Sequence, residues 1–289
     1  MAQSPAHKFG QLIGNLLEEL VAPLLREFAE SHGLFLDHQG KPRAARRGKK
    51  VSWRDAYGNL HDLDYVLERN GTNEVLGTPV AFIEVAWRRY TKHARNKAQE
   101  IQGAILPLRE KFERSTPILG AVLAGEFTEG SIEQLRSHGF QVLYFHYELI
   151  VAAFASEGID IAFDERTSDA TFRRCVKEIE RVSDSSRKSI KSHLKAACHG
   201  EITDFMTALA KRFERMIDKV IVVPLYGRSN EFTTVEEALS FLDSHSVYEG
   251  CGDFRKYEVV VQFSNGDRVE GSFRNQVKVK EFLHFISVQ

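Results

Sequence analysis

The sequence has little cysteine, and what it has is widely spaced. Three cysteines occur in 289 residues, with no CxxC pair: Cys175, Cys198 and Cys251. This spacing excludes a disulfide framework and a zinc-ribbon ligand set, and it indicates reduced thiols of an intracellular protein. His199 follows Cys198 directly, but nothing nearby completes a zinc set.

Signals for secretion and membrane insertion are also missing. No apolar run reaches the ~20 residues that a membrane-spanning helix needs. The first residues, MAQSPAHKFGQ, lack the charged and apolar regions of a signal peptide. We therefore expect a cytoplasmic protein without a membrane partner. An excess of charge of one sign is absent too, because the net charge is -1. Any contact with nucleic acid must then come from local basic patches.

The apolar periodicity predicts an α/β protein. Residues 9–32 have helical spacing, and strands alternate with helices from there to residue 156, which predicts a mixed sheet covered by helices on both sides. Charged helices follow, and then a strand, a helix, a hairpin through Asn265-Gly266 and a last helix. We expect three parts: an α/β core (1–160), a helical segment (161–219) and a small α+β unit (220–289).

A basic stretch precedes the first strands of this core. Residues 34–53 show no periodicity and are predicted to form a loop or arm. Six cations within ten residues have no acid between them: Lys41, Arg43, Arg46, Arg47, Lys49 and Lys50. Such a loop suits contact with phosphates, and the alternative is a solvated surface loop.

Two carboxylates on neighbouring strands organise the chain. Asp64 lies in the stretch HDLDYVLE, and Glu84 lies in the apolar run VAFIEVAW, with a turn expected at Asn70-Gly71 between them. A carboxylate in a buried strand is costly unless it is paired or bound to a metal. The alternative for Glu84 is an ion pair with Arg88 or Arg95.

The two flanking helices carry further charges. In the first, Gly14 precedes Glu18 by one turn, and a glycine there lets that face approach another backbone closely. The alternative is that Glu18 is a solvated surface charge. The second helix, predicted for residues 91–114, carries Lys97 at the border of its apolar stripe and Lys92 at its start.

These residues together resemble the PD-(D/E)XK nuclease superfamily, which includes most type II restriction endonucleases. That family has an αβββαβ core, an acid on one strand and (D/E)xK on the next. Asp64 and Glu84 match the acids, Gly14 to Glu18 matches the GxxxE pattern of the first helix, and the order of elements agrees over residues 9–150. Ala86 occupies the lysine position, which is a departure from the family pattern.

The resemblance implies a restriction-endonuclease-like core and Mg²⁺-dependent cleavage of double-stranded DNA by a homodimer. It implies that Asp64, Glu84, the Val85 carbonyl and Glu18 bind Mg²⁺. A lysine that has migrated to the following helix would be Lys97, with Lys92 or Arg88 as other choices. The expected DNA contacts are Arg46, Arg47, Lys49, Lys50, Arg88, Lys92 and the helix around residues 187–195. Two alternatives stay open: a repair or phage-defence nuclease, and, because of Ala86, an inactive nucleic-acid-binding protein.

Overall fold

The computed structural model describes residues 4–46, 48–90, 94–164, 166–213, 216–225, 227–244, 254–264 and 267–287. The chain divides into two compact units, residues 1–208 and 209–289. The helices expected to form a separate middle segment belong mostly to the first unit, so the structure has two parts where the sequence suggested three. Within the described ranges, no helix is both long enough and apolar enough to cross a membrane.

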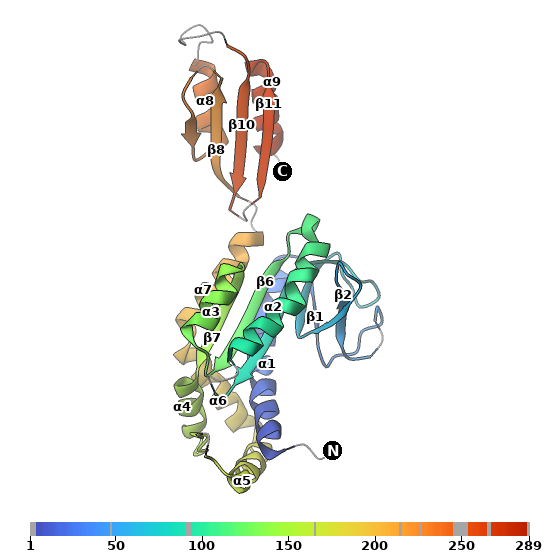
Figure 1. The fold of residues 1–289 in the computed structure, drawn as a ribbon, viewed down its shortest axis with the longest axis vertical. Coiled ribbons are helices and arrows are strands. Elements are labelled where there is room, and N and C mark those ends of the chain that lie inside the picture. Colours follow the sequence, from blue (N-terminus) through green and yellow to red (C-terminus); the bar gives the residue numbers. More distant parts are fainter. Residues whose placement is uncertain are drawn as a thin grey trace. The chain divides into compact units, whose positions relative to one another are not determined.

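A five-stranded mixed sheet forms the centre of the first unit (Figure 1). Its strands, in spatial order, are β1 (Leu34–His38), β4 (Tyr65–Arg69), β5 (Thr78–Arg88), β6 (Ile118–Gly125) and β7 (Phe140–His146). The pairs β1–β4 and β4–β5 are antiparallel, whereas β5–β6 and β6–β7 are parallel. This arrangement confirms the predicted α/β class with a mixed sheet.

Helices cover both faces of this sheet. They are α1 (Pro5–Ser31), α2 (Ala94–Lys111), α3 (Glu129–Ser137) and α4 (Tyr147–Ala155), with a short 3₁₀ helix η2 (Glu113–Ser115) after α2. Farther from the sheet, α5 (Asp169–Glu180) packs on α1, α6 (Asp184–Ala197) packs on α4 and α1, and α7 (His199–Phe213) follows. Trp87 of β5 packs against Phe9 of α1, whereas Phe82 and Ala86 pack with Ile101 of α2. Because neighbouring strand residues face opposite ways, α1 and α2 lie on opposite faces (Figure 1).

Three local predictions were wrong. The single helix expected from Ser186 to Lys219 ends at Ala197, with Cys198 as its cap, and α7 begins at His199. Residues 34–53 are not all loop, because β1 joins the sheet, and β2 (Val51–Arg54) pairs with β3 (Leu60–Leu63) as a separate ribbon. Asn70-Gly71 does not form a tight turn, since a longer loop, residues 70–77, joins β4 to β5.

A buried ion network explains that longer loop. The Arg43 guanidinium donates to Asp37 at 2.9 Å and to Glu68 at 2.5 Å, and the three side chains are at most 3% exposed. Arg43 also donates to the carbonyls of Thr72 and Val75. The loop therefore closes over Arg43, and its carbonyl groups complete the hydrogen bonds of the buried cation.

The second unit is a small α+β fold with its own apolar core. Its antiparallel sheet has the order β11 (Arg268–Phe273), β10 (Tyr257–Phe263), β8 (Ile217–Pro224), β9 (Asn230–Phe232). Helices α8 (Val235–Ser244) and α9 (Gln276–Ser287) pack on this sheet and on each other. The hairpin strands lie at the predicted residues, and their turn at Asn265-Gly266 lies outside the described residues. The short β9 was not predicted.

Candidate active site

Asp64 and Glu84 face each other across two neighbouring strands. Asp64 lies between the end of β3 and the start of β4, where the chain passes from the ribbon into the main sheet. The register that pairs Tyr65 with Ile83 places Asp64 opposite Glu84. The Val85 amide donates to Asp64 Oδ2 at 2.7 Å. Asp64 is thus fixed to the strand that carries Glu84 by a backbone hydrogen bond.

Glu84 is partly buried and forms no ion pair with a described residue. Among the described residues, no group hydrogen-bonds to its Oε1 atom, which is shielded from solvent. Burial, followed by repulsion from Asp64, raises the pKa of Glu84 to about 8. Arg88 lies instead 3.8 Å from Glu100, and neither Arg88 nor Arg95 forms an ion pair with Glu84 in the described part of the chain. The structural ion pair considered from the sequence is therefore not present.

Lys97 supplies positive charge beside the two carboxylates. It projects from the first turn of α2, its side chain is 14% exposed, and it donates to Glu100 at 2.9 Å. Burial raises the pKa of Asp64, and the Val85 amide and the Lys97 charge oppose that rise. Lys97 also acts to lower the pKa of Glu84. The Lys97 charge therefore opposes the rise in pKa of both acids. Lys92, the second choice, lies outside the described residues.

Glu18 is a third carboxylate, close enough to Asp64 for the two charges to repel each other. Burial, with repulsion from Asp64 and Glu19, raises the pKa of Glu18 to about 7. The Tyr65 hydroxyl donates to the Glu18 carbonyl at 2.9 Å and so fixes this turn of α1 to β4. On the far side, Arg187 and Lys191 of α6 form ion pairs with Glu19, at 3.0 and 2.9 Å.

The donor set suits a divalent cation held by two carboxylates and a carbonyl. Among the described side chains, no three or more of His, Cys, Asp and Glu are arranged to hold a metal ion, which leaves Glu18 outside the ligand set. The N–H and C=O of one residue project to the same side of a strand, so the Val85 carbonyl points toward the side of Asp64. Two carboxylates, a carbonyl and waters are ligands that Mg²⁺ accepts, and the unsatisfied Glu84 oxygen fits such a cation.

Some of the predicted DNA contacts already pair with acids of the protein, and others are exposed. Arg46 donates twice to Asp37, at 2.8 and 2.9 Å, and its side chain is 9% exposed, so it stabilises the loop and is not free to reach a phosphate. Lys50 is exposed but pairs with Asp62 at 2.5 Å. Lys49 is exposed, whereas Arg47 lies outside the described residues. The sequence could not show that Arg46 has an internal partner, because Asp37 was assigned to a loop.

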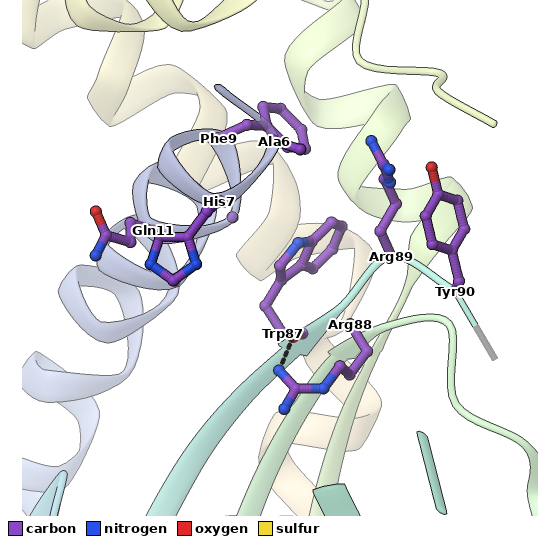
Figure 2. A pocket seen from close by; sticks show the side chains of 10 residues that line it. Ala6, His7, Phe9, Gln11, Trp87, Arg88, Arg89 and Tyr90 are labelled. Atoms are coloured by element: carbon purple, nitrogen blue, oxygen red, sulfur yellow. Dashed lines mark hydrogen bonds between the residues drawn. The ribbon is translucent and has the colours of Figure 1, made fainter. Parts of the chain in front are cut away.

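A pocket of about 380 Å³ lies between the start of α1 and the end of β5 (Figure 2). Trp87, Arg88, Arg89 and Tyr90 line it from the strand side. Of these, only Arg88 was singled out from the sequence. The available signal was the Arg88-Arg89 pair directly after an apolar strand.

Comparisons with known proteins give little further information. No protein-family model and no curated protein matches the sequence. A crystal structure described as a protein of unknown function, AF1548, is similar at 13% sequence identity with a TM-score of 0.30. The alignment covers 63% of this chain and 99% of that chain. Similarity at this level carries no argument, so the functional conclusion rests on the geometry of the site.

The buried carboxylates make the stability of the metal-free protein depend on pH. The pKa of Glu84 is raised from 4.5 to about 8, so the folded state binds more protons than the unfolded chain between these values. Stability therefore falls as the pH rises through this range. Glu84→Gln removes the buried charge and is expected to raise the melting temperature at pH 8, by roughly 2–4 °C for each kcal/mol regained.

Thermal denaturation in EDTA from pH 5 to pH 9 measures this effect. The matched control is Glu27→Gln, which changes an exposed acid of α1 and is expected to leave the pH profile unchanged. A Glu84→Gln profile parallel to that of the wild type would show that Glu84 carries no buried charge.

Proposed function

We propose that this protein is a Mg²⁺-dependent nuclease of the PD-(D/E)XK type that hydrolyses phosphodiester bonds in DNA. The observation that carries the proposal is the Glu84 carboxylate, which is partly buried with one shielded oxygen unsatisfied and lies opposite Asp64 on the neighbouring strand. Burial of such a pair is unfavourable unless a cation lies between or beside the two groups.

The order of elements supports the same proposal. The succession α1, β1, β4, β5, α2, β6 agrees with an αβββαβ core, with the β2–β3 ribbon inserted between the first two strands of the sheet. Glu84 lies on β5 and Asp64 directly before β4, which is compatible with the positions of the two acids in that core. Lys97, close enough to act on both acids, replaces the cation missing at Ala86 and weighs against an inactive site.

The residues of the site have separable roles in this mechanism. Asp64, Glu84 and the Val85 carbonyl would hold Mg²⁺, which when bound polarises the phosphate and activates water. The Lys97 ammonium group orients the attacking water and stabilises negative charge that develops on the phosphate. The pKa of Glu18, about 7, suits a group that exchanges a proton with water at neutral pH.

A digest of unmethylated phage DNA, with sequenced ends, tests the proposal. The finer form of the proposal is a type II restriction endonuclease that acts as a homodimer, and it requires discrete fragments with Mg²⁺ and none with EDTA. Smeared or structure-dependent products indicate a repair or phage-defence nuclease with the same site. Binding without cleavage in either Mg²⁺ or Mn²⁺ would overturn the proposed activity.

Lys97→Met is expected to lower the single-turnover cleavage rate by about 10²- to 10³-fold, because it removes the positive charge beside the scissile phosphate. The matched control is Lys177→Met, at an exposed position of α5, which should cut at the wild-type rate. The same assay on Lys92→Met decides between the two lysines. If Lys92→Met loses activity and Lys97→Met does not, the assignment of Lys97 is wrong.

A further inference from the structure

The pocket at the end of β5 is open because α1 carries two glycines there. Gly10 and Gly14 line it on the helix side. A Cβ added at Gly14 would meet no atom within 4 Å, so this glycine does not serve a close approach of two backbones, contrary to the sequence-based expectation. A glycine inside a helix is destabilising by about 0.5–1 kcal/mol relative to alanine. Its effect here is to leave space in the part of the pocket that α1 lines.

The lining of this pocket favours a negatively charged ligand. It includes Arg88, Arg89 and His7 and no carboxylate. The first turn of α1 also lacks acidic residues, and its free N–H groups carry partial positive charge. Arg88 keeps part of its side chain exposed and has only a weak contact with Glu100, at 3.8 Å.

Burial lowers the pKa of Arg89, and nearby Tyr90, Tyr147 and Asp164 oppose that shift without forming an ion pair among the described residues. The Arg89 Nη1 atom is buried and has no hydrogen-bond partner among the described residues. Its guanidinium lies over the rings of Tyr90 and Phe172, 4.0 and 4.2 Å from their centroids. Stacking holds the planar group in place but does not neutralise its charge. Buried charges are normally paired, and no described acid forms an ion pair with Arg89, so this oriented cation can take an anionic partner in the pocket.

We propose that this pocket binds a phosphate group carried by a nucleotide, with Arg89 as its cationic ligand. A guanidinium fork matches phosphate oxygens in geometry and in charge. The inference rests on the proposed function, since Arg88 lies on the same strand as Glu84, about 13 Å further along at 3.3 Å per residue. The phosphate would belong to the bound DNA strand, either at its end or within it, away from the scissile bond.

Two variants test the pocket by different means. Arg89→Met removes the cation, and Gly14→Leu fills the pocket while improving the helix propensity of α1. Both are expected to weaken DNA binding by about 10- to 100-fold, the effect of losing a hydrogen bond to a charged group. The control is Arg173→Met, which removes an equal charge from an exposed position of α5. Melting temperatures show whether a variant is destabilised. Arg89→Met loses its stacking contacts and can be destabilised, whereas Gly14→Leu should not be, so weaker DNA binding by Gly14→Leu reports on the pocket itself.

Fluorescence anisotropy in EDTA, with labelled duplexes that carry a 5′-phosphate or a 5′-hydroxyl, measures binding without cleavage. A loss confined to the phosphorylated duplex assigns the pocket to a terminal phosphate, and an equal loss for both assigns it to an internal one. If both variants bind DNA with wild-type affinity, the proposed phosphate site is wrong, even if the protein cuts DNA. If the variants lose affinity but the wild type never cuts with Mg²⁺, the proposed function fails and the pocket stands.

Discussion

Glu84→Gln and Asp64→Asn are each expected to abolish the proposed Mg²⁺-dependent cleavage of DNA, with a loss on the order of 10³-fold or more, because a bound metal would contribute several kcal/mol of transition-state stabilisation. Each change replaces a negatively charged oxygen by a neutral amide of the same shape. The fold is expected to be retained, since Glu84 has no ion pair to lose. Single-turnover cleavage across a Mg²⁺ titration and calorimetric Mg²⁺ binding measure the two effects.

Asp62→Asn provides a matched control for these variants. Asp62 lies two residues before Asp64, on β3, but its carboxylate accepts hydrogen bonds from Ser52 and Lys50 at 2.5 Å and is partly exposed. Its loss should weaken the β2–β3 ribbon slightly and leave the cleavage rate unchanged. Cleavage at the wild-type rate by Glu84→Gln would refute the assigned site, whatever the Asp62 variant does.

Arg43→Met is expected to lower the free energy of unfolding by about 3–5 kcal/mol, because it leaves two buried carboxylates, Asp37 and Glu68, without their shared cation. Urea denaturation measures this loss. Gly77 adds to the constraint, since its amide donates to Glu68 at 2.6 Å and a Cβ there would overlap the Arg69 carbonyl. Few substitutions elsewhere in this unit should have so large an effect.

Lys49→Met is the control for Arg43→Met, because Lys49 is an exposed cation of the same loop. It should leave stability unchanged within about 0.5 kcal/mol. The double variant Arg43→Met/Glu68→Leu is expected to regain part of the lost stability, since it removes the buried Glu68 charge and leaves Asp37 paired with Arg46. If Arg43→Met lowers the free energy of unfolding by less than about 1 kcal/mol, the ion network does not stabilise the loop of residues 70–77.

The regular elements could be predicted because their signal is local. Apolar periodicity located α1, β5, β6, β7 and the hairpin strands β10 and β11 within a few residues. The strand β1 was missed because its residues follow a glycine, precede a basic loop and are mostly half-buried. The partners of Arg43 and Arg46 were also hidden, since Glu68 is 25 residues from Arg43 in the chain. A cation cluster looks the same in sequence whether its charges face solvent or buried acids.

Parts of the candidate site could be predicted where the polarity of one residue differed from that of its neighbours in the sequence. Glu84 stands out as an acid in an apolar strand, and the structure places Asp64 opposite it. Lys97 could be selected because it borders the apolar stripe of its helix. The phosphate pocket could not be predicted, because it requires the start of α1 to lie beside the end of β5, more than 70 residues further along the chain. Gly14 gave a signal, but without that packing its open space could not be distinguished from a close helix contact.

Because Lys97 lies on α2, the contacts that position the cation differ from those that position the two carboxylates. Asp64 is joined to the strand of Glu84 by a hydrogen bond to the Val85 amide, whereas Lys97 is positioned by the packing of α2, through the apolar contacts of Ala98, Ile101, Ile105 and Leu108 and hydrogen bonds nearer its C-terminal end. Sliding α2 by one turn, about 5.4 Å, would withdraw the charge and leave the carboxylate pair intact. A lysine at position 86 would be part of the strand and immune to such a shift. Under the proposed mechanism, turnover would depend on the docking of one helix, whereas metal affinity would depend on the sheet.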